Sequence, residues 1–131
     1  MAFGFLSDGR SLISGSVDTT ARIWDVKTGE LQHILNHKDG VGGLAFASDG
    51  KTVVTASGNE IIFWDAVSGC QLRTIFAAQP VNNFALSDRD RFLVSGSSSG
   101  TADVWNLDSG QSIQSLHHQG DIWGIAFART T

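Results

Sequence analysis

Three residues in the middle of this 131-residue sequence have the order of a phosphate-binding motif. Gly50-Lys51-Thr52 matches the end of a loop whose backbone N–H groups hold phosphate at the start of a helix. Ala45 stands where the first glycine of that loop belongs, and the residues after Thr52 have the pattern of a strand. We therefore expect a turn that enters a strand at this point, and no nucleotide site.

The histidines have spacings that suggest metal binding. His33 and His37 are four residues apart, which suits zinc when both side chains lie on one face of a helix. Their segment has the pattern of a strand and a loop, and no cluster of Cys or Glu supplies further ligands. The pair His117-His118 has no such neighbours either. We expect neither a metal nor another cofactor.

Residues for nucleophilic catalysis are present but are not arranged for it. No segment has the sharp strand-to-helix turn that exposes a nucleophilic serine. Cys70 is the single cysteine, so no disulfide can form within the chain, which fits a reducing compartment. We expect this chain not to be an enzyme.

Composition and charge exclude further classes. The net charge is −4, so there is no excess of positive charge to bind nucleic acid or anionic lipid. No apolar run approaches the roughly 18 residues of a membrane span. The start, MAFGFLSDGR, has no basic residue before its apolar part, unlike a signal peptide. We expect a cytoplasmic protein, with the nucleus as an alternative, that binds neither nucleic acid nor a membrane.

The sequence repeats itself about every forty residues. Trp24, Trp64 and Trp105 are spaced by 40 and then 41 residues. They end three similar segments, which read RSLISGSVDTTARIWDV, KTVVTASGNEIIFWDA and RFLVSGSSSGTADVWNL. A fixed period of this size is typical of a repeat protein.

Each cycle has the pattern of four short strands. The 15 glycines and the single proline favour strands joined by tight turns. Asp-Gly and Ser-Gly pairs recur at matching places because tight turns need residues that tolerate positive φ. The expected strands are 2–6, 12–16, 21–26, 31–35, 41–46, 52–57, 61–66, 71–76, 81–86, 92–97, 102–107, 112–116 and 122–127.

The motifs within these cycles resemble those of the WD-repeat family over essentially the whole chain. Ile23-Trp24-Asp25, Phe63-Trp64-Asp65 and Val104-Trp105-Asn106 are similar to the Trp-Asp ending of a WD repeat. Asn36-His37 and His117-His118 stand where that family has a Gly-His pair. The resemblance implies an all-β fold of β-propeller blades, each a four-stranded antiparallel sheet beside a central channel.

The resemblance also implies a division of the chain into blades. We expect blade 1 at about 2–36, blade 2 at about 37–77, blade 3 at about 78–117 and the start of a fourth blade at 118–131. Known propellers close with about four to eight blades. We therefore expect an incomplete, open ring in this chain.

In the WD-repeat family, a polar network of His, Ser or Thr, Asp and Trp ties each blade together. Such a network satisfies buried groups that would cost about 1–3 kcal/mol each if left unpaired. Ala77 replaces the histidine of blade 3, Gly58 and Asn59 replace the aspartate of blade 2, and Ser99 replaces that of blade 3. The expected members are Ser14, Asp18, Trp24, His37, Thr55, Trp64, Ser95, Trp105 and His118.

By this resemblance, the chain is a non-catalytic scaffold for protein–protein interaction and part of a larger propeller. Its expected partners are proteins or peptides, including further WD repeats or a second copy of the chain. An open arc would otherwise expose apolar blade faces beyond what soluble monomers tolerate. The alternative is a structural remnant, or a regulatory appendage of a longer enzyme or sensor.

Family partners often bind the loops before each inner strand and the turns between second and third strands. A solvated polar rim is the alternative interpretation of these loops. Trp123 stands out because its counterparts are Gly42 and Asn82, so it either anchors a partner or packs against the next blade. The other candidate binding residues are Lys38, Asp39, Asn59, Gln79 and Gln119.

Overall fold

The computed structural model describes residues 2–5, 11–47, 49–87, 91–97 and 100–117, which form twelve strands and no helix. Sheet 1 consists of β1 (Ala2–Phe5), β2 (Ser11–Gly15), β3 (Thr20–Asp25) and β4 (Leu31–Asn36). Sheet 2 consists of β5 (Val41–Phe46), β6 (Thr52–Ser57), β7 (Glu60–Asp65) and β8 (Gln71–Phe76). Sheet 3 consists of β9 (Val81–Leu86), β10 (Phe92–Ser97), β11 (Thr101–Asn106) and β12 (Gln111–His117).

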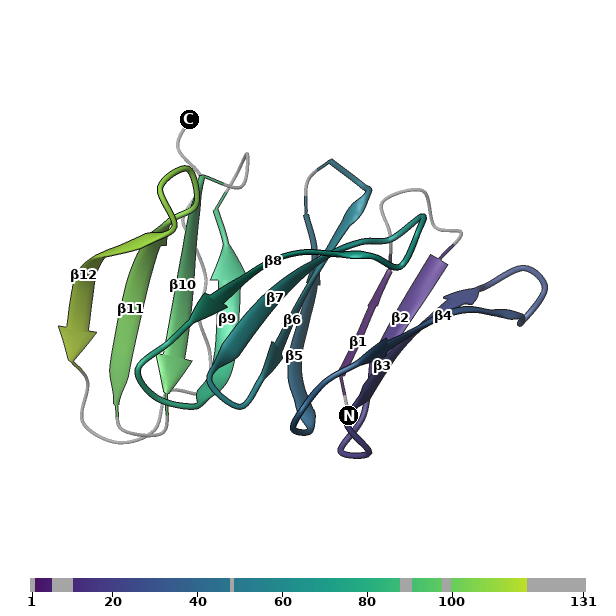
Figure 1. The fold of residues 1–131 in the computed structure, drawn as a ribbon, viewed down its shortest axis with the longest axis horizontal. Helices are drawn as coiled ribbons and strands as arrows, with labels where there is room; N and C mark the ends of the chain where they lie inside the picture. The colour runs from purple at the N-terminus through teal and green to yellow at the C-terminus, as the bar shows by residue number, and fades with distance from the viewer. Residues whose placement is uncertain (1, 6–10, 48, 88–90, 98–99, 118–131) are drawn as a thin grey trace.

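The three sheets stand side by side in an open arc (Figure 1). Within each sheet, every strand pairs antiparallel with the next one along the chain. The sheets touch mainly through their first strands, because β5 contacts β1 and β9 contacts β5. The first strand of each sheet therefore lies on the inner side of the arc.

Apolar side chains fill both spaces between the sheets. Ile13, Ile23 and Leu35 of sheet 1 pack against Val53, Ile62 and Trp64 of sheet 2. Side chains alternate along a strand, so the neighbouring residues Val54, Ile61 and Phe63 face sheet 3. Fully burying one such side chain contributes about 1.5–3 kcal/mol, so the two interfaces hold the arc together.

The all-β fold of four-stranded antiparallel sheets, predicted from the sequence, is confirmed, and the described residues do not close a ring. Expected and observed strand ends differ by at most one residue. The third strand of each sheet stops one residue early because Asp25, Asp65 or Asn106 begins a turn there. The expected strand 122–127, at the start of the fourth blade, lies outside the described residues.

Gly43 allows sheets 2 and 3 to approach closely. A methyl group at position 43 would lie 2.9 Å from Cε1 of Phe84, whose ring is buried. At the neighbouring Gly42, a methyl group would meet nothing within 4 Å. The two glycines therefore form a matched pair, in which only Gly43 is needed for packing.

We predict that Gly43→Val lowers the free energy of unfolding by about 1–3 kcal/mol, because the added carbons must displace the Phe84 ring. The control Gly42→Val changes it by less than about 0.5 kcal/mol, since that side chain points into open space. Urea unfolding measures both values. Equal effects of the two substitutions would contradict the packing role of Gly43.

Candidate functional site

Each sheet carries a tryptophan on its third strand whose indole N–H bonds to a hydroxyl on the second strand. The hydroxyl lies two residues beyond the tryptophan's direct register partner, so the two side chains form a diagonal cross-strand pair. The three indoles thus have equivalent surroundings in the three sheets. The pairs are Trp24 with Ser14 at 3.0 Å, Trp64 with Thr55 at 2.9 Å, and Trp105 with Ser95 at 3.0 Å.

A β-bulge stands at each of these tryptophans. The register between the third and fourth strands shifts between Ile23 and Trp24, and it shifts again at Trp64 and at Trp105. Bulges bend a strand and re-aim its side chains. The repeated bulge therefore accompanies the repeated indole position in all three sheets.

Sheet 2 holds the most complete network. Thr55 is fully buried, and its Oγ1 lies 2.7 Å from Nε2 of His37 and 2.9 Å from Nε1 of Trp64. The Nδ1 atom of His37 lies 3.0 Å from the carbonyl oxygen of Leu35 in sheet 1. The imidazole also packs against the Trp64 indole, with ring centroids 5.3 Å apart. His37 therefore connects the last strand of sheet 1 to the centre of sheet 2.

The hydrogen bonds assign the protons in this network. A carbonyl oxygen only accepts, so Nδ1 of His37 carries a hydrogen and donates it to Leu35. In the neutral ring Nε2 is then an acceptor and takes the hydroxyl hydrogen of Thr55, which in turn accepts the N–H of Trp64. Burial lowers the pKa of His37 from its ordinary 6.5, although the bond to Leu35 and the charge of Glu60 oppose this.

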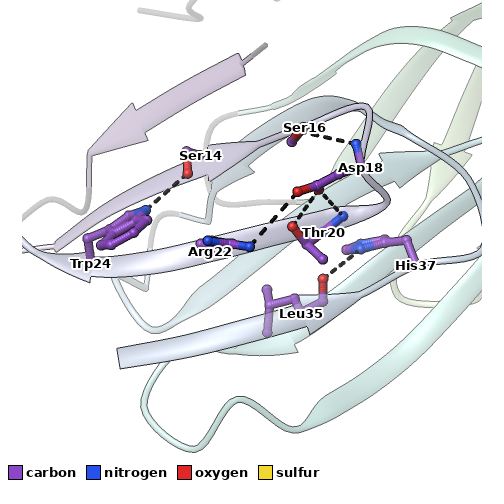
Figure 2. A network of polar contacts seen from close by, with 8 residues as sticks. All are labelled: Ser14, Ser16, Asp18, Thr20, Arg22, Trp24, Leu35 and His37. Atoms are coloured by element: carbon purple, nitrogen blue, oxygen red, sulfur yellow. Dashed lines mark hydrogen bonds and ion pairs between the residues drawn. The ribbon is translucent and has the colours of Figure 1, made fainter. Parts of the chain in front are cut away.

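In sheet 1, the expected network residues form two separate groups (Figure 2). Ser14 bonds to Trp24, whereas Asp18 accepts from the backbone N–H and the hydroxyl of Thr20. The hydrogen bond from the Thr20 hydroxyl is the main cause of a lowered pKa of Asp18. The Arg22 guanidinium is 3.9 Å from Asp18, and both are exposed, so this ion pair contributes little.

In sheet 3, Ala77 takes the place that His37 has in sheet 2. The backbone N–H of Ala77 bonds to Asn59, as that of His37 bonds to Thr19. Beside Ala77 is a hollow of about 160 Å³, which Ser95 lines. A second hollow, of about 190 Å³, lies beside Ser14 and Trp24 in sheet 1.

A further repeated group, with a structural role the sequence analysis did not predict, caps the turn after each third strand. Oδ1 of Asp25, Asp65 or Asn106 accepts two backbone N–H bonds from the following turn. Asn106 serves as well as aspartate because the turn needs only an acceptor oxygen. A glycine with φ between 74° and 76° closes each turn. The sequence signal for this turn is the Thr-Gly or Ser-Gly pair whose glycine stands four residues after the capping residue.

One side chain in the fourth strand of sheet 1, and one in the fourth strand of sheet 2, bonds to the sheet that follows. Nε2 of His33 in β4 lies 2.8 Å from the carbonyl oxygen of Val67 in sheet 2. Arg73, the counterpart in β8, donates to the carbonyl of Leu107 in sheet 3 at 2.8 Å, and its guanidinium lies over the Phe63 ring. His33 therefore acts in packing between sheets, with its Nε2 at Val67, whereas Nε2 of His37 lies at Thr55.

The proposed rim loops lie together along the lower edge of the arc in Figure 1. Lys38 is exposed and reaches Glu60 at 3.5 Å, while Asn59 donates to the carbonyl of Ala77. Val17, which is 89% exposed in the β2–β3 turn, is an apolar rim residue missed from the sequence. Asp39 and Gln79 are exposed on this edge. His118, Gln119, Trp123 and Ser99 lie outside the described residues.

The Gly50-Lys51-Thr52 motif forms a turn that enters β6, as expected. Asp49 accepts the backbone N–H groups of Lys51 and Thr52 and the Thr52 hydroxyl, so the groups that would face a phosphate are already bonded. In the described ranges, no three His, Cys, Asp or Glu residues are placed to hold a metal ion. No helix there is long and apolar enough to cross a membrane.

We predict that Thr55→Val lowers the free energy of unfolding by about 2–4 kcal/mol. The substitution keeps the shape but leaves the Trp64 N–H and Nε2 of His37 without a partner. Thr55→Ser keeps the hydroxyl and should cost only about 1 kcal/mol for the lost methyl group. Ser95→Ala removes one bond, so its effect should be smaller than that of Thr55→Val. Urea unfolding measures all three, and a harmless Thr55→Val would refute the network.

We predict that acid destabilises the chain through His37. The unfolded histidine binds a proton near pH 6.5, whereas the folded one binds it at lower pH. The contribution of His37 is therefore fully present above the unfolded pKa and is lost as the pH falls through the folded pKa. Urea midpoints between about pH 7.5 and about pH 5 should fall less steeply in His37→Gln. Parallel pH profiles of the two proteins would contradict this.

Comparison with known proteins gives the same repeats. The family model described as "WD domain, G-beta repeat" matches residues 1–25, 29–65 and 69–106. The serine-threonine kinase receptor-associated protein of Dictyostelium discoideum is 30% identical over 102 residues, which are 77% of this chain and 34% of the relative. Cilia- and flagella-associated protein 52 of Homo sapiens is 31% identical over 111 residues, which are 79% of this chain and 18% of the relative.

WD repeat-containing protein 82 of Drosophila melanogaster is 33% identical over 93 residues, which are 65% of this chain and 29% of the relative. The chain thus spans about a third or less of the length of these relatives. The family model covers most of the sequence, and its three matches contain the three tryptophans with equivalent hydrogen bonds. The chain belongs to the WD-repeat family, whose members are generally scaffolds for protein–protein interaction.

Proposed function

We propose that this chain is a non-catalytic scaffold for protein–protein interaction that works within a larger ring of such sheets. In this proposal the blades are residues 2–36, 37–77 and 78–117, and 118–131 begin the next. The His37–Thr55–Trp64 network holds blade 2 to blade 1, and the Ser–Trp pairs stiffen the other two. An intracellular location is part of the same proposal.

The observation that carries this function is an uncovered apolar face at the end of sheet 3. Leu35 in β4 and Ile75 in β8 are 1% and 6% exposed, because each packs against the following sheet. Leu116 is their counterpart in β12, since it pairs with Ala102 as Leu35 pairs with Ala21. Leu116 is 48% exposed. The same position that is buried twice within the chain is open at its end.

The chemistry of this end face fits another sheet of the same kind. Gln114 stands where Arg73 and His33 stand in the earlier sheets, as the register of β11 with β12 shows. Those two side chains bond to backbone carbonyls of the next sheet. A glutamine amide can donate in the same way. Two copies of the chain would supply six sheets, which is within the range of about four to eight for closed propellers.

The lower rim is the proposed surface for other partners. Lys38, Asp39, Asn59 and Gln79 place charges and amides there, and Val17 adds an exposed apolar side chain. Gln119 and Trp123 belong to the same proposed surface. Such a mixture of apolar and polar groups is typical of protein interfaces. A regulatory appendage of a longer protein is the second candidate, because the chain spans only a part of its relatives.

We predict that the isolated chain associates in solution and that Leu116→Lys weakens association by about tenfold or more. A lysine on the end face would bury a charge against the neighbouring sheet. The matched control is Leu72→Lys, since Leu72 is 56% exposed in sheet 2, whose two faces are already covered. Sedimentation velocity over a range of concentrations separates the outcomes. A monomer with sharp cooperative unfolding would show that the end face needs no partner.

A further inference from the structure

We propose that the hollow in sheet 3 is a binding site for an imidazole ring. This site goes beyond the scaffold role and does not depend on it. The hollow lies between β10, β11 and the loop from β8 to β9, and it is partly open to solvent. Ala77, Ser95 and Asp103 are among the residues that line it.

Sheet 2 of the same chain already holds an imidazole ring at the equivalent position. In sheet 2, the imidazole of His37 lies beside the hydroxyl of Thr55 and the indole of Trp64. In sheet 3, the corresponding hydroxyl and indole belong to Ser95 and Trp105, with the same bond between them. The ring is missing there, because Ala77 provides a methyl group in its place, and Asp103 stands opposite Ser95 where Ile62 stands opposite Thr55.

The size of the hollow suits a small ring. Its volume is about 160 Å³. An apolar cavity of about 150 Å³ in another protein holds benzene. Imidazole is a smaller ring than benzene, so the volume of the hollow is large enough for it.

The polar groups in the hollow match the two nitrogens of imidazole. Ser95 is 3% exposed, and among the described residues its oxygen has one hydrogen bond, which it accepts from Trp105. Its hydroxyl hydrogen is therefore available to an acceptor nitrogen, just as Thr55 donates to His37. Oδ1 of Asp103 accepts a hydrogen bond from the Ser115 hydroxyl at 2.6 Å. The other carboxylate oxygen of Asp103 can accept the N–H of the guest ring.

The hollow in sheet 1 offers different chemistry, because the carboxylate that lines it, Asp18, is engaged by Thr20 and Arg22. Arg22 occupies the register position opposite Ser14, whereas Asp103 is opposite Ser95. A guanidinium donates only, so it cannot accept the N–H of a guest ring as Asp103 can. Trp24 therefore serves as an internal comparison for Trp105.

The test uses the indole N–H signals of the 131-residue chain in ¹⁵N–¹H NMR spectra. Imidazole should shift the Trp105 signal, which Trp105→Phe identifies, with a Kd on the order of 1 mM for so small a ligand. The Trp64 and Trp24 signals should stay in place. Pyrrole has the same ring size and an N–H but no acceptor nitrogen, so it should leave the Trp105 signal unchanged.

Two variants complete the test. Ala77→His should fill the hollow from within, remove the response to imidazole and raise the urea midpoint. Asp103→Asn keeps the shape of the side chain but should weaken imidazole binding by about tenfold. Retained binding in Ala77→His, equal shifts with pyrrole, or equal shifts of all indoles would each overturn the proposal.

A second probe, N-acetylhistidine methylamide, distinguishes a histidine side chain from a free heterocycle as the source of the ring. Binding of both probes supports the proposal and assigns the site to a histidine side chain of a bound peptide. Binding of imidazole alone supports it as well and assigns the site to a free heterocycle. Binding of neither probe overturns it.

Discussion

The apolar faces of each sheet require cover from a neighbouring sheet if they are to be removed from water. Sheet 2 meets this requirement on both sides, and β6 is buried without interruption from Val53 to Ser57. The same requirement explains why sheets 1 and 3 cover sheet 2 and why Leu116, at the end, is left exposed. Burial is non-directional, so it brings the sheets together but does not fix their angle or register. Polar contacts between the sheets supply that precision.

These polar contacts recur at both interfaces, but one interface has more of them than the other. His37 bonds to both Leu35 and Thr55, and so it fixes the position of sheet 1 relative to sheet 2. Ala77 cannot do this for sheets 2 and 3, where the bond from Arg73 to Leu107 corresponds to the contact of His33 with Val67. We expect the interface with the histidine network to respond to pH, because burial lowers the pKa of His37, whereas an arginine stays charged at all relevant pH values.

Much of the fold was predictable because its signals are local. The spacing of the tryptophans, the alternation of apolar residues and the Ser-Gly or Asp-Gly turns predicted every described strand to within one residue. The pairs of Trp64 with Thr55 and of Trp105 with Ser95 followed from the family resemblance. Asp18 was expected in the same network, but it bonds to Thr20 and Arg22, which lie on its own hairpin. A short polar side chain takes the nearest donor, and no repeat pattern reveals which one that is.

By itself, the sequence determined the unit of this protein, a four-stranded sheet with a tryptophan and tight turns at fixed places. The periodicity of a strand and the residues that form a turn depend on neighbours only a few positions apart, so both can be recognised in the sequence. Only the tertiary structure decided which groups meet between units, such as His33 with Val67 and Arg73 with Leu107. It also decided that the loss of one imidazole at Ala77 leaves a hollow beside Ser95. The hydrogen bonds of His33 and Arg73 join residues 34 positions apart, and their geometry depends on how two whole sheets pack.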